Sequence, residues 1–398
     1  MQVRPAPPVA GALAAVLAVT LTSCTPVART PTSPAPPTAT GPAPTTAGST
    51  PTASATTPGD LTLGADGRPF TVSEVARFQA PWAMAFLPGS ADALVTQRSG
   101  TLLLVDTTTG DAREVGGVPR VRAAGQGGLG DIVLGPTFAT DHTVYLSWVE
   151  SGEGGSGAVV GRARLVTGDA PRLEGLTTIW TQTPKVAGDG HFSHRLAFSP
   201  DGATLFVTSG ERQKFTPAQD RGVTLGKIMR MRPDGSDAQI WTSGHRNPLG
   251  IAFAPDGNLW STEMGPQGGD ELNLIVQGGN YGWPEASNGS HYGGGPIPDH
   301  APGDGLEPPK VYWTPSVSPG SLMIYDGDAF APWQGDAFIG ALSGEALIHV
   351  DLDGTNAVEA DHWDMGDRIR EVEQGPDGTI WLLTDGGAGR LLHLPPVS

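Results

Sequence analysis

The sequence is poor in cysteine and in basic residues. Cys24 is the single cysteine among 398 residues, so no internal disulfide can form. Lysine and arginine together number 24 against 41 acidic residues, which gives a formal net charge of −17. Because phosphate contacts need a basic face, this balance argues against nucleic acid as a partner.

The apolar run near the N-terminus is too short to span a bilayer comfortably. Residues 9–21 are mostly alanine, valine and leucine; Arg4 precedes them and Leu21-Thr22-Ser23-Cys24 ends the run. This pattern favours a signal peptide over a transmembrane helix. Its end resembles a bacterial lipobox, in which the cysteine is lipidated; the alternative is an ordinary secretory signal with an incidental cysteine. We predict a lipoprotein signal peptide at 1–23 and a lipid on Cys24 that anchors the protein extracytoplasmically to the cell membrane.

A linker without aromatic residues, leucine or isoleucine follows. Residues 24–60 are almost entirely threonine, proline, alanine, serine and glycine. Such a segment buries too little apolar surface to offset the entropy of ordering, and its prolines favour an extended spacer. We predict a disordered linker at 24–60 and a folded domain at 61–398.

Strongly helical periodicity is absent from the folded part. A short sequence motif recurs there instead. An apolar strand meets a turn of the Pro-Asp-Gly type, and a second apolar strand follows, which is a hairpin signal. The copies are Ala85-Phe86-Leu87-Pro88-Gly89, Ile132-Val133-Leu134-Gly135-Pro136, Leu196-Ala197-Phe198-Ser199-Pro200-Asp201-Gly202, Ile251-Ala252-Phe253-Ala254-Pro255-Asp256-Gly257, Val372-Glu373-Gln374-Gly375-Pro376-Asp377-Gly378 and a divergent Val317-Ser318-Pro319-Gly320. Most copies are about 50 to 65 residues apart, the length of a four-stranded blade plus a loop. The pattern predicts an all-β, six-bladed β-propeller of four-stranded antiparallel blades with a loop-built channel mouth. A pair of β-sandwiches or another repeat array is the alternative.

The segment from Gly244 to Trp283 contains the highest concentration of candidate binding residues. An Arg246-Asn247 pair stands before Pro248, and a loop rich in carbonyls and carboxylates follows at 263–273. Such a loop can coordinate a hard cation, and the arginine can neutralise an anionic ligand beside it. The segment predicts a site for a charged cofactor bound through a metal ion.

Several fragments, taken in order, resemble the glucose/sorbosone dehydrogenase family, soluble quinoproteins that use pyrroloquinoline quinone (PQQ). The resemblance covers nearly the whole folded part. The fragments are Pro81-Trp82-Ala83-Met84-Ala85-Phe86, Gly125-Gln126-Gly127-Gly128-Leu129, His191-Phe192-Ser193-His194-Arg195-Leu196, Gly226-Lys227-Ile228, the segment from Gly244 to Trp283, and Arg368-Ile369-Arg370-Glu371-Val372.

This resemblance implies roles for residues that face the quinone. Gln126 matches the family glutamine that hydrogen-bonds the quinone. His191 matches the catalytic base, which removes the proton of the substrate hydroxyl while hydride passes to the quinone. Arg246 and Asn247 match the pair at the reactive quinone edge, where Arg246 would stabilise the growing negative charge. An aldose would thereby be oxidised at its anomeric hydroxyl to a lactone, and an unidentified acceptor would take the electrons.

The resemblance also implies residues that hold the cofactor and calcium. Arg368 and Arg370 match two arginines that bind PQQ carboxylates, for which planar guanidinium groups are suited. Gly265 and Pro266 match positions whose main-chain carbonyls hold the Ca²⁺ that bridges to PQQ and polarises it.

A second, structural calcium is implied by Glu271 and Tyr281. These residues match positions that ligate such an ion in some family members. Without the resemblance, the sequence is equally compatible with Glu271 as part of a solvent-exposed turn. Arg368 and Arg370 could then form a surface salt-bridge pair.

The sequence departs from the family pattern at three places. Ser343 stands in the region where a lysine often pairs with PQQ, His194 stands where a small residue is usual, and Glu211-Arg212 stands where some members have a glutamine. His194 would crowd the site or supply a second base. Ser343 motivates a different hypothesis, a cofactor-less propeller that binds a glycan or a protein at the cell surface. A calcium-dependent lactonase ranks last, because that chemistry has no tricarboxylate cofactor to bind.

Overall fold

The computed structural model describes residues 61–398. The predicted signal peptide, the lipidated Cys24 and the predicted linker lie outside these residues and stay predictions. Within 61–398, none of the helices combines the length and the apolar character needed to cross a membrane.

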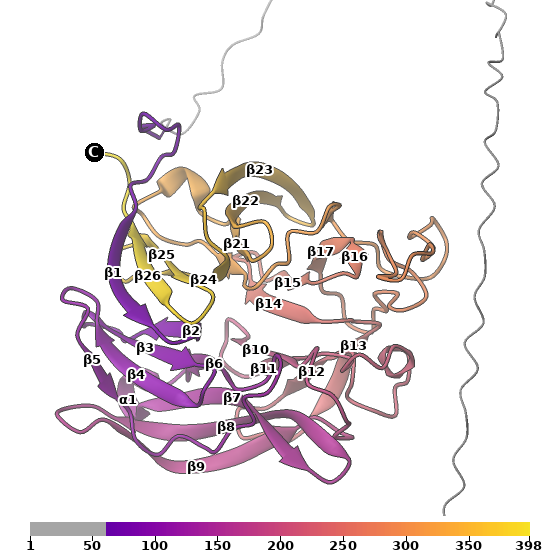
Figure 1. The fold of residues 1–398 in the computed structure, drawn as a ribbon, viewed down its shortest axis with the longest axis horizontal. Coiled ribbons are helices and arrows are strands. Elements are labelled where there is room, and N and C mark those ends of the chain that lie inside the picture. Colours follow the sequence, from indigo (N-terminus) through magenta and orange to yellow (C-terminus); the bar gives the residue numbers. More distant parts are fainter. Residues whose placement is uncertain (1–60) are drawn as a thin grey trace, which may run out of the picture. The chain divides into compact units, whose positions relative to one another are not determined.

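Six four-stranded antiparallel sheets are arranged in a ring, which confirms the predicted six-bladed propeller (Figure 1). From the channel outward, blades 1 to 6 are β2 (Pro81–Phe86), β3 (Asp92–Gln97), β4 (Thr101–Asp106) and β5 (Ala112–Glu114); β6 (Leu129–Leu134), β7 (Thr143–Gly152), β8 (Gly155–Val166) and β9 (Arg172–Thr181); β10 (Ser193–Phe198), β11 (Leu205–Ser209), β12 (Lys227–Met231) and β13 (Gln239–Ser243); β14 (Pro248–Phe253), β15 (Leu259–Glu263), β17 (Asp270–Leu274) and β19 (Val311–Trp313); β20 (Met323–Ile324), β21 (Ala337–Ala341), β22 (Ala346–Asp353) and β23 (Asn356–Asp364); and β24 (Ile369–Gln374), β25 (Ile380–Thr384), β26 (Gly389–Leu394) and β1 (Ser73–Phe78).

Outside the blades, the described chain forms short elements only. They are the helix α1 (Phe138–Asp141), the 3₁₀ turns η1 (Thr216–Ala218) and η2 (Ala331–Trp333), and a two-stranded ribbon of β16 (Gln267–Gly268) and β18 (Gly289–Ser290).

Five of the six recurring turns form the hairpins between the innermost strand of a blade and the next strand. The expectation of a sixth copy at Val317-Ser318-Pro319-Gly320 is wrong, because this segment precedes β20, the innermost strand of blade 5. In three of the five an aspartate accepts a hydrogen bond from the main-chain N–H two residues later: Asp201 from Ala203, Asp256 from Asn258 and Asp377 from Thr379. The glycine after each aspartate has a positive φ, which a side chain would disfavour. The local chemistry of these turns therefore sets the register of the hairpins.

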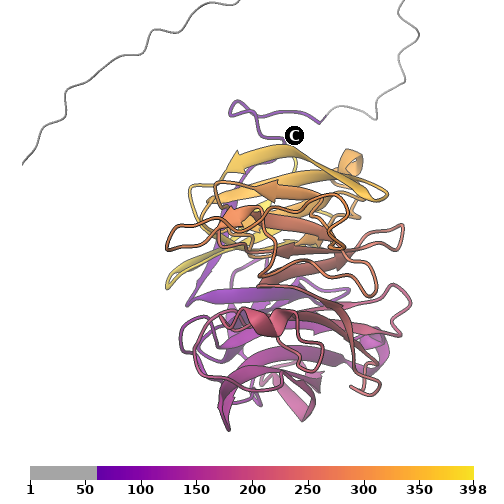
Figure 2. The same ribbon diagram turned by 90° about the vertical axis from the view of Figure 1, so that its right-hand side faces the viewer.

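Strands from both ends of the described chain close the ring. β1 pairs antiparallel with β26, so that Phe78 lies opposite Gly389 and Ser73 opposite His393. An isolated bridge between Phe70 and Pro396 extends this pairing, and Figure 2 shows the two ends side by side. Blade 6 thus contains three strands from the C-terminal end and one from the N-terminal end.

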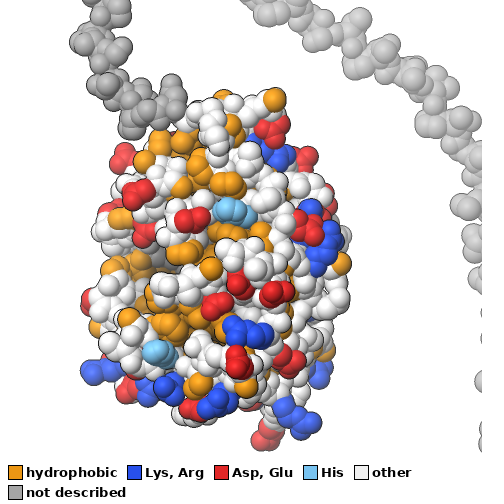
Figure 3. Space-filling model, turned by 90° about the vertical axis from the view of Figure 1, so that its left-hand side faces the viewer, with side chains coloured by type: hydrophobic (Ala, Val, Ile, Leu, Met, Phe, Trp, Pro, Cys, Tyr) orange, Lys and Arg blue, Asp and Glu red, His pale blue; other side chains and the backbone are white. Residues whose placement is uncertain are grey.

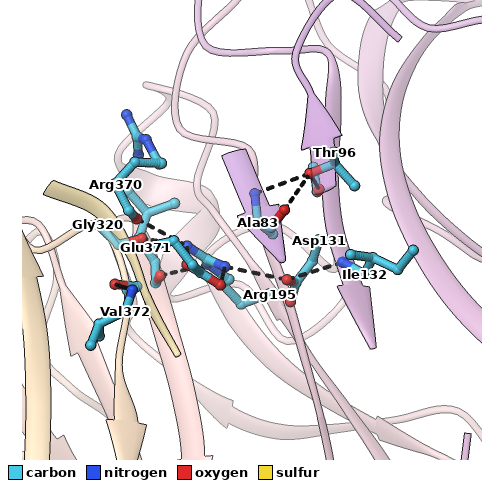
Figure 4. A network of polar contacts seen from close by, with 12 residues as sticks. Ala83, Thr96, Asp131, Ile132, Arg195, Gly320, Arg370, Glu371 and Val372 are labelled. Atoms are coloured by element: carbon cyan, nitrogen blue, oxygen red, sulfur yellow. Dashed lines mark hydrogen bonds and ion pairs between the residues drawn. The ribbon is translucent and has the colours of Figure 1, made fainter. Parts of the chain in front are cut away.

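Arg195 of β10 contacts residues in or beside all six blades, and Figure 4 shows its contacts with Asp131, Gly320 and Glu371. Its guanidinium group forms ion pairs with Asp131 of blade 2, at 3.2 Å, and with Glu371 of blade 6, at 2.6 Å. It also donates to the carbonyl oxygens of Leu249 in blade 4 and of Gly320 beside blade 5. Trp82 of blade 1 packs against it, with the guanidinium carbon 4.0 Å from the ring centroid. A single buried cation therefore fixes the inner strands relative to one another.

Apolar side chains fill the space between neighbouring blades. Tyr145, Leu196, Val207 and Met229, for example, form one buried cluster that joins blades 2 and 3. On the face shown in Figure 3, acidic and basic side chains are interspersed on the surface. The propeller is therefore a rigid ring whose loops at one channel mouth can hold a site.

Candidate active site

Two cavities adjoin at one mouth of the channel, where the innermost strands begin. The first, here the arginine cavity, has a volume of about 260 Å³. It is lined by Trp82, Arg98, Gln126, Phe192, Ser193, Asn247, Leu249, Met264, Ser318, Leu342, Arg368, Arg370 and Asp385. The second, here the histidine cavity, has a volume of about 270 Å³. It is lined by His191, Glu211, Gln213, Phe215, Arg246, Pro266, Trp283, His291, Tyr292 and Gly293.

Two pairs of chain neighbours place the cavities next to each other. His191 lines the histidine cavity, and the next residue, Phe192, lines the arginine cavity. Likewise, Arg246 lines the histidine cavity and Asn247 lines the arginine cavity. A reactant in one cavity would therefore lie beside a ligand in the other.

His191 is held in place from both sides. Its main-chain N–H donates to the side-chain oxygen of Gln126 at 2.7 Å, and its Nδ1 lies 2.5 Å from Oε1 of Glu211. Only 7% of the residue is exposed. Burial lowers the pKa of His191 and outweighs the opposing effect of Glu211, so the imidazole is neutral near pH 7. With Nδ1–H donated to Glu211, Nε2 retains the lone pair that a general base needs.

Glu211 is the ionised partner of this pair. Its carboxylate accepts hydrogen bonds from the main-chain N–H groups of Gln213, Lys214 and Phe215 in the following turn. Burial raises the pKa of Glu211, but the hydrogen bonds from His191 and from this turn more than offset that effect and leave the pKa below its ordinary value. In the sequence Glu211 stood out only as a departure from a family pattern. Its role depends on the fold of the turn, for which the sequence carries no clear signal.

Glu263 fixes the main chain of the Arg246-Asn247 pair. One carboxylate oxygen accepts the N–H groups of both residues, and the other lies 2.8 Å from Nδ1 of His245. His245 in turn lies 2.8 Å from the hydroxyl of Thr242. His245 therefore positions the pair indirectly and faces neither cavity.

The guanidinium group of Arg246 is only partly satisfied. It donates to the carbonyl of Met264 at 2.8 Å and to the hydroxyl of Tyr292 at 3.1 Å, and it lies 5.3 Å from the ring centroid of Trp283. Its Nε is buried and has no hydrogen-bond partner within residues 61–398. A buried, unpaired donor at the cavity wall fits an anionic or carbonyl ligand.

Arg368 and Arg370 share one carboxylate at the arginine cavity. Nε of Arg368 lies 3.1 Å, and Nη2 of Arg370 3.3 Å, from the oxygens of Asp385. Arg98 lines the same cavity. Three guanidinium groups against one carboxylate leave excess positive charge, which fits a ligand that carries several carboxylates.

The loop after β15 presents main-chain oxygens. Asp270 accepts hydrogen bonds from the N–H groups of Gly265, Val317 and Ser318, at 2.6 to 2.8 Å, and so fixes the loop. The carbonyl oxygens of Gly265 and Pro266 accept no hydrogen bond from the described residues. Free carbonyl oxygens on a braced loop are suitable calcium ligands.

Glu271 lies next to a second buried carboxylate. Glu271 and Glu263 are register partners in β17 and β15. Burial, together with the charge of Glu263, raises the pKa of Glu271 to about 8. Two such carboxylates fit a divalent cation, which would remove the repulsion between them.

The side chain of Tyr281 has a structural role. Its hydroxyl donates to the carbonyl of Leu274 at 2.6 Å and accepts the N–H of Val276, and its ring stacks on His245. The main-chain carbonyl therefore remains as the group that Tyr281 could offer to a metal.

Two residues expected near the site lie outside both cavity linings. His194 stacks on Trp82, its Nδ1 lies 2.7 Å from the hydroxyl of Ser147, and burial lowers its pKa to about 3. The expectation that His194 crowds the site or supplies a second base is wrong, because its ring is directed into the packing between blades. Ser343 is 2.8 Å from the hydroxyl of Ser318, which does line the arginine cavity.

Fold and site together define a class: six-bladed propellers with a carboxylate-paired histidine and an anion-binding cavity at one channel mouth. Residues 78–393 match the family model described as Glucose / Sorbosone dehydrogenase. The chain therefore belongs to the glucose/sorbosone dehydrogenase family, oxidoreductases that act on sugars.

Similar proteins agree with this assignment. The chain is 40% identical over 336 residues to the aldose sugar dehydrogenase YliI of Escherichia coli (strain K12), covering 79% of this chain and 90% of that protein. The apo-form crystal structure of the soluble aldose sugar dehydrogenase from Escherichia coli aligns with a TM-score of 0.77 at 38% identity, over 82% of this chain and 100% of that one. The PQQ-bound aldose sugar dehydrogenase from Streptomyces coelicolor aligns with a TM-score of 0.69 at 31% identity, over 82% and 98%.

Proposed function

We propose that the protein oxidises an aldose at its anomeric hydroxyl to the lactone, using PQQ and Ca²⁺. One observation carries this proposal: the His191–Glu211 pair opens into a cavity that Arg246 also lines, directly beside the arginine cavity. A base for a hydroxyl proton and a site for a multiply anionic acceptor thus stand next to each other. The PQQ-bound relative from Streptomyces coelicolor supports the choice of acceptor.

The arginine cavity would hold the cofactor. Arg368 and Arg370 suit its carboxylates, Gln126 and Asn247 offer amide groups at the wall, and the unpaired Nε of Arg246 is available at the edge shared with the histidine cavity. The carbonyl oxygens of Gly265 and Pro266 would hold Ca²⁺. When bound, PQQ supplies the ortho-quinone that accepts two electrons as hydride, and Ca²⁺ polarises it.

The histidine cavity would hold the sugar. Phe215 and Trp283 stack with ring centroids 5.6 Å apart, and together with Tyr292 they offer apolar faces for the C–H groups of a pyranose. This packing would bring the anomeric hydroxyl to Nε2 of His191.

His191 would then accept the hydroxyl proton at Nε2. Glu211 stabilises the resulting imidazolium and keeps its ring oriented, because its carboxylate is fixed by the N–H groups of the following turn. The electrons would finally pass to an acceptor that the protein meets outside the cytoplasm.

The test is reconstitution of the apo-protein with PQQ and Ca²⁺, followed by dye reduction with a panel of aldoses. Activity is expected in the wild type, whereas His191→Ala should retain PQQ binding and lose turnover. Arg246→Ala should weaken PQQ binding itself. Folded protein with neither quinone absorbance nor activity would refute the proposal.

A second candidate is the cofactor-less propeller that binds a glycan or a protein. Ser343, in the region of the family lysine, is the observation that favours it. PQQ titration separates the two: binding of a sugar or partner without uptake of PQQ would support the second candidate.

We further propose that the enzyme works extracytoplasmically as a lipoprotein. The lipobox-like residues that end in Cys24 support this location. Metabolic labelling with a radioactive fatty acid should mark the wild type and spare Cys24→Ser, and equal labelling of both would contradict the anchor.

A further inference from the structure

Blade 5 carries a second cluster of ligating side chains, remote in sequence from the proposed active site. Asp336 immediately precedes β21, His349 and Asp351 lie in β22, and Asp361 lies in β23. None of the four lines either cavity at the channel mouth. The enzyme proposed above gives this cluster no role.

The strand register brings these residues to one face of the blade. Phe338 is the register partner of His349, and His349 is the partner of Asp361. Positions two residues apart on a strand share a face, so Asp336 lies beside Phe338 and Asp351 beside His349. The cluster therefore follows from the pairing of three strands.

Their ligand atoms are spaced as around a metal ion. Nε2 of His349 lies 3.0 Å from Oδ2 of Asp336 and 3.5 Å from Oδ1 of Asp351. One ligand atom from each of the three residues lies within 4.8 Å of the others. Bond lengths of about 2.0–2.2 Å to a central ion place tetrahedral ligand atoms roughly 3.3–3.6 Å apart, close to the two separations measured from Nε2.

The other side of the imidazole carries a carboxylate partner, as metal-bound histidines usually do. Nδ1 of His349 lies 3.1 Å from Oδ2 of Asp361. Nε2 hydrogen-bonds Asp336 at 3.0 Å. With Nδ1–H donated to Asp361, a metal ion would take the place of the proton between Nε2 and Asp336, and this carboxylate–histidine arrangement is the usual support of a metal-bound histidine. The arrangement orients the ring and makes it a better ligand.

The imidazole is also rigid and buried. It lies nearly parallel to Phe338, with an interplanar angle of 7°, and to Trp363, with an angle of 5°. Its side chain is 4% exposed, whereas that of Asp351 is 64% exposed. A fixed buried ligand and an exposed carboxylate give a preformed site with a path for entry from solvent.

We propose that Asp336, His349 and Asp351 form a binding site for a divalent transition-metal ion such as Zn²⁺ or Co²⁺. One imidazole and two carboxylates are a ligand set that suits such ions, and water would complete the coordination. The ion would balance the charge of Asp336 and Asp351. It would also clamp β22 to the start of β21 in the outer part of blade 5.

The test uses the whole protein, stripped of metal and kept in excess Ca²⁺ so that hard oxygen sites are filled. Titration with Co²⁺ should give visible d–d absorption, and calorimetry with Zn²⁺ should show one tight site. Asp351→Asn, at a side chain that is 64% exposed, should weaken both signals at least tenfold. Asp353→Asn, an exposed aspartate on the same strand, is the matched control and should bind as the wild type does.

Asp361→Asn separates a metal site from a simple ion-pair cluster. Loss of the outer carboxylate should weaken Co²⁺ binding about 10- to 100-fold. Equal binding by the wild type and Asp351→Asn, or no binding by the wild type, would overturn the proposal and leave His349 as a cation held among carboxylates. Because neither readout uses sugar oxidation, failure here is distinct from failure of the proposed function.

Discussion

His191 and Glu211 form a buried pair in which Nδ1 lies 2.5 Å from the carboxylate oxygen. Their chain positions are 20 residues apart, on either side of β10 and β11. The pair sets the tautomer of His191 and tunes its basicity, which gives Glu211 a positioning role in the proposed reaction.

Glu211→Gln should reduce kcat by about 10²-fold with little change in KM, because the imidazolium loses its counter-charge. Glu211 raises the pKa of His191, so its neutralisation should also move the acid limb of the kcat–pH profile to lower pH. Steady-state kinetics across pH measures both effects. Glu174→Gln, on the outer strand β9, is the control. An unchanged acid limb would mean that Glu211 acts only on folding.

Arg195→Met should destabilise the propeller by about 3–5 kcal/mol, because Asp131 and Glu371 would be left buried and unpaired. Urea unfolding measures the change in free energy of unfolding. Adding Asp131→Asn and Glu371→Gln to Arg195→Met should recover part of the loss. Arg77→Met, at an exposed ion pair, is the control and should change stability by less than about 1 kcal/mol.

The raised pKa of Glu371 predicts that the folded protein loses stability as pH rises. Burial raises its pKa to about 7, above the ordinary 4.5. The folded state therefore holds a proton that the unfolded chain releases, and the stabilisation present below about pH 4.5 disappears as pH rises through about 7. The shift corresponds to roughly 3 kcal/mol. Free energies of unfolding from pH 5 to 8 should fall in the wild type and fall less steeply in Glu371→Gln; parallel curves would contradict this assignment.

Phe78→Ala should weaken closure of the ring. Phe78 is buried at the end of β1, in an apolar cluster that also contains Trp381 and Leu383 of blade 6 and Met84 of blade 1. Removing its ring should cost about 3–5 kcal/mol. Thermal or urea unfolding measures this cost, and Val72→Ala, at an exposed position just before β1, should be nearly neutral. Equal effects of the two changes would indicate that β1 adds little to blade 6.

The blades were predictable because their signals are local. Alternating apolar strands and Asp-Gly turns such as Asp256-Gly257 specify hairpins without reference to distant residues. Closure of blade 6 by β1 was not predictable, since the strand 73–78 shows no feature that assigns it to the far end of the chain.

The residues of the candidate active site were predictable only because several sequence fragments together resemble one family. Gln126, His191, Arg246 and Arg370 do line adjoining cavities, although their chemical roles stay predictions. Contacts between distant residues were missed. Asp385 is not part of a recognisable motif, yet its carboxylate binds both Arg368, which lies 17 residues earlier in the chain, and Arg370, which lies 15 residues earlier. Such pairs arise from tertiary packing, which periodicity and turn chemistry do not encode.

The shared sixth blade has a consequence for biosynthesis. β1 is the first strand of the propeller to leave the ribosome, yet its partner β26 (Gly389–Leu394) is the last. Until β26 has been synthesised, β1 is a strand without its partner and the ring stays open. Any earlier intermediate exposes a sheet edge that can pair with another chain. A polypeptide exported as it is made would therefore need either protection of this strand or rapid completion of the last blade.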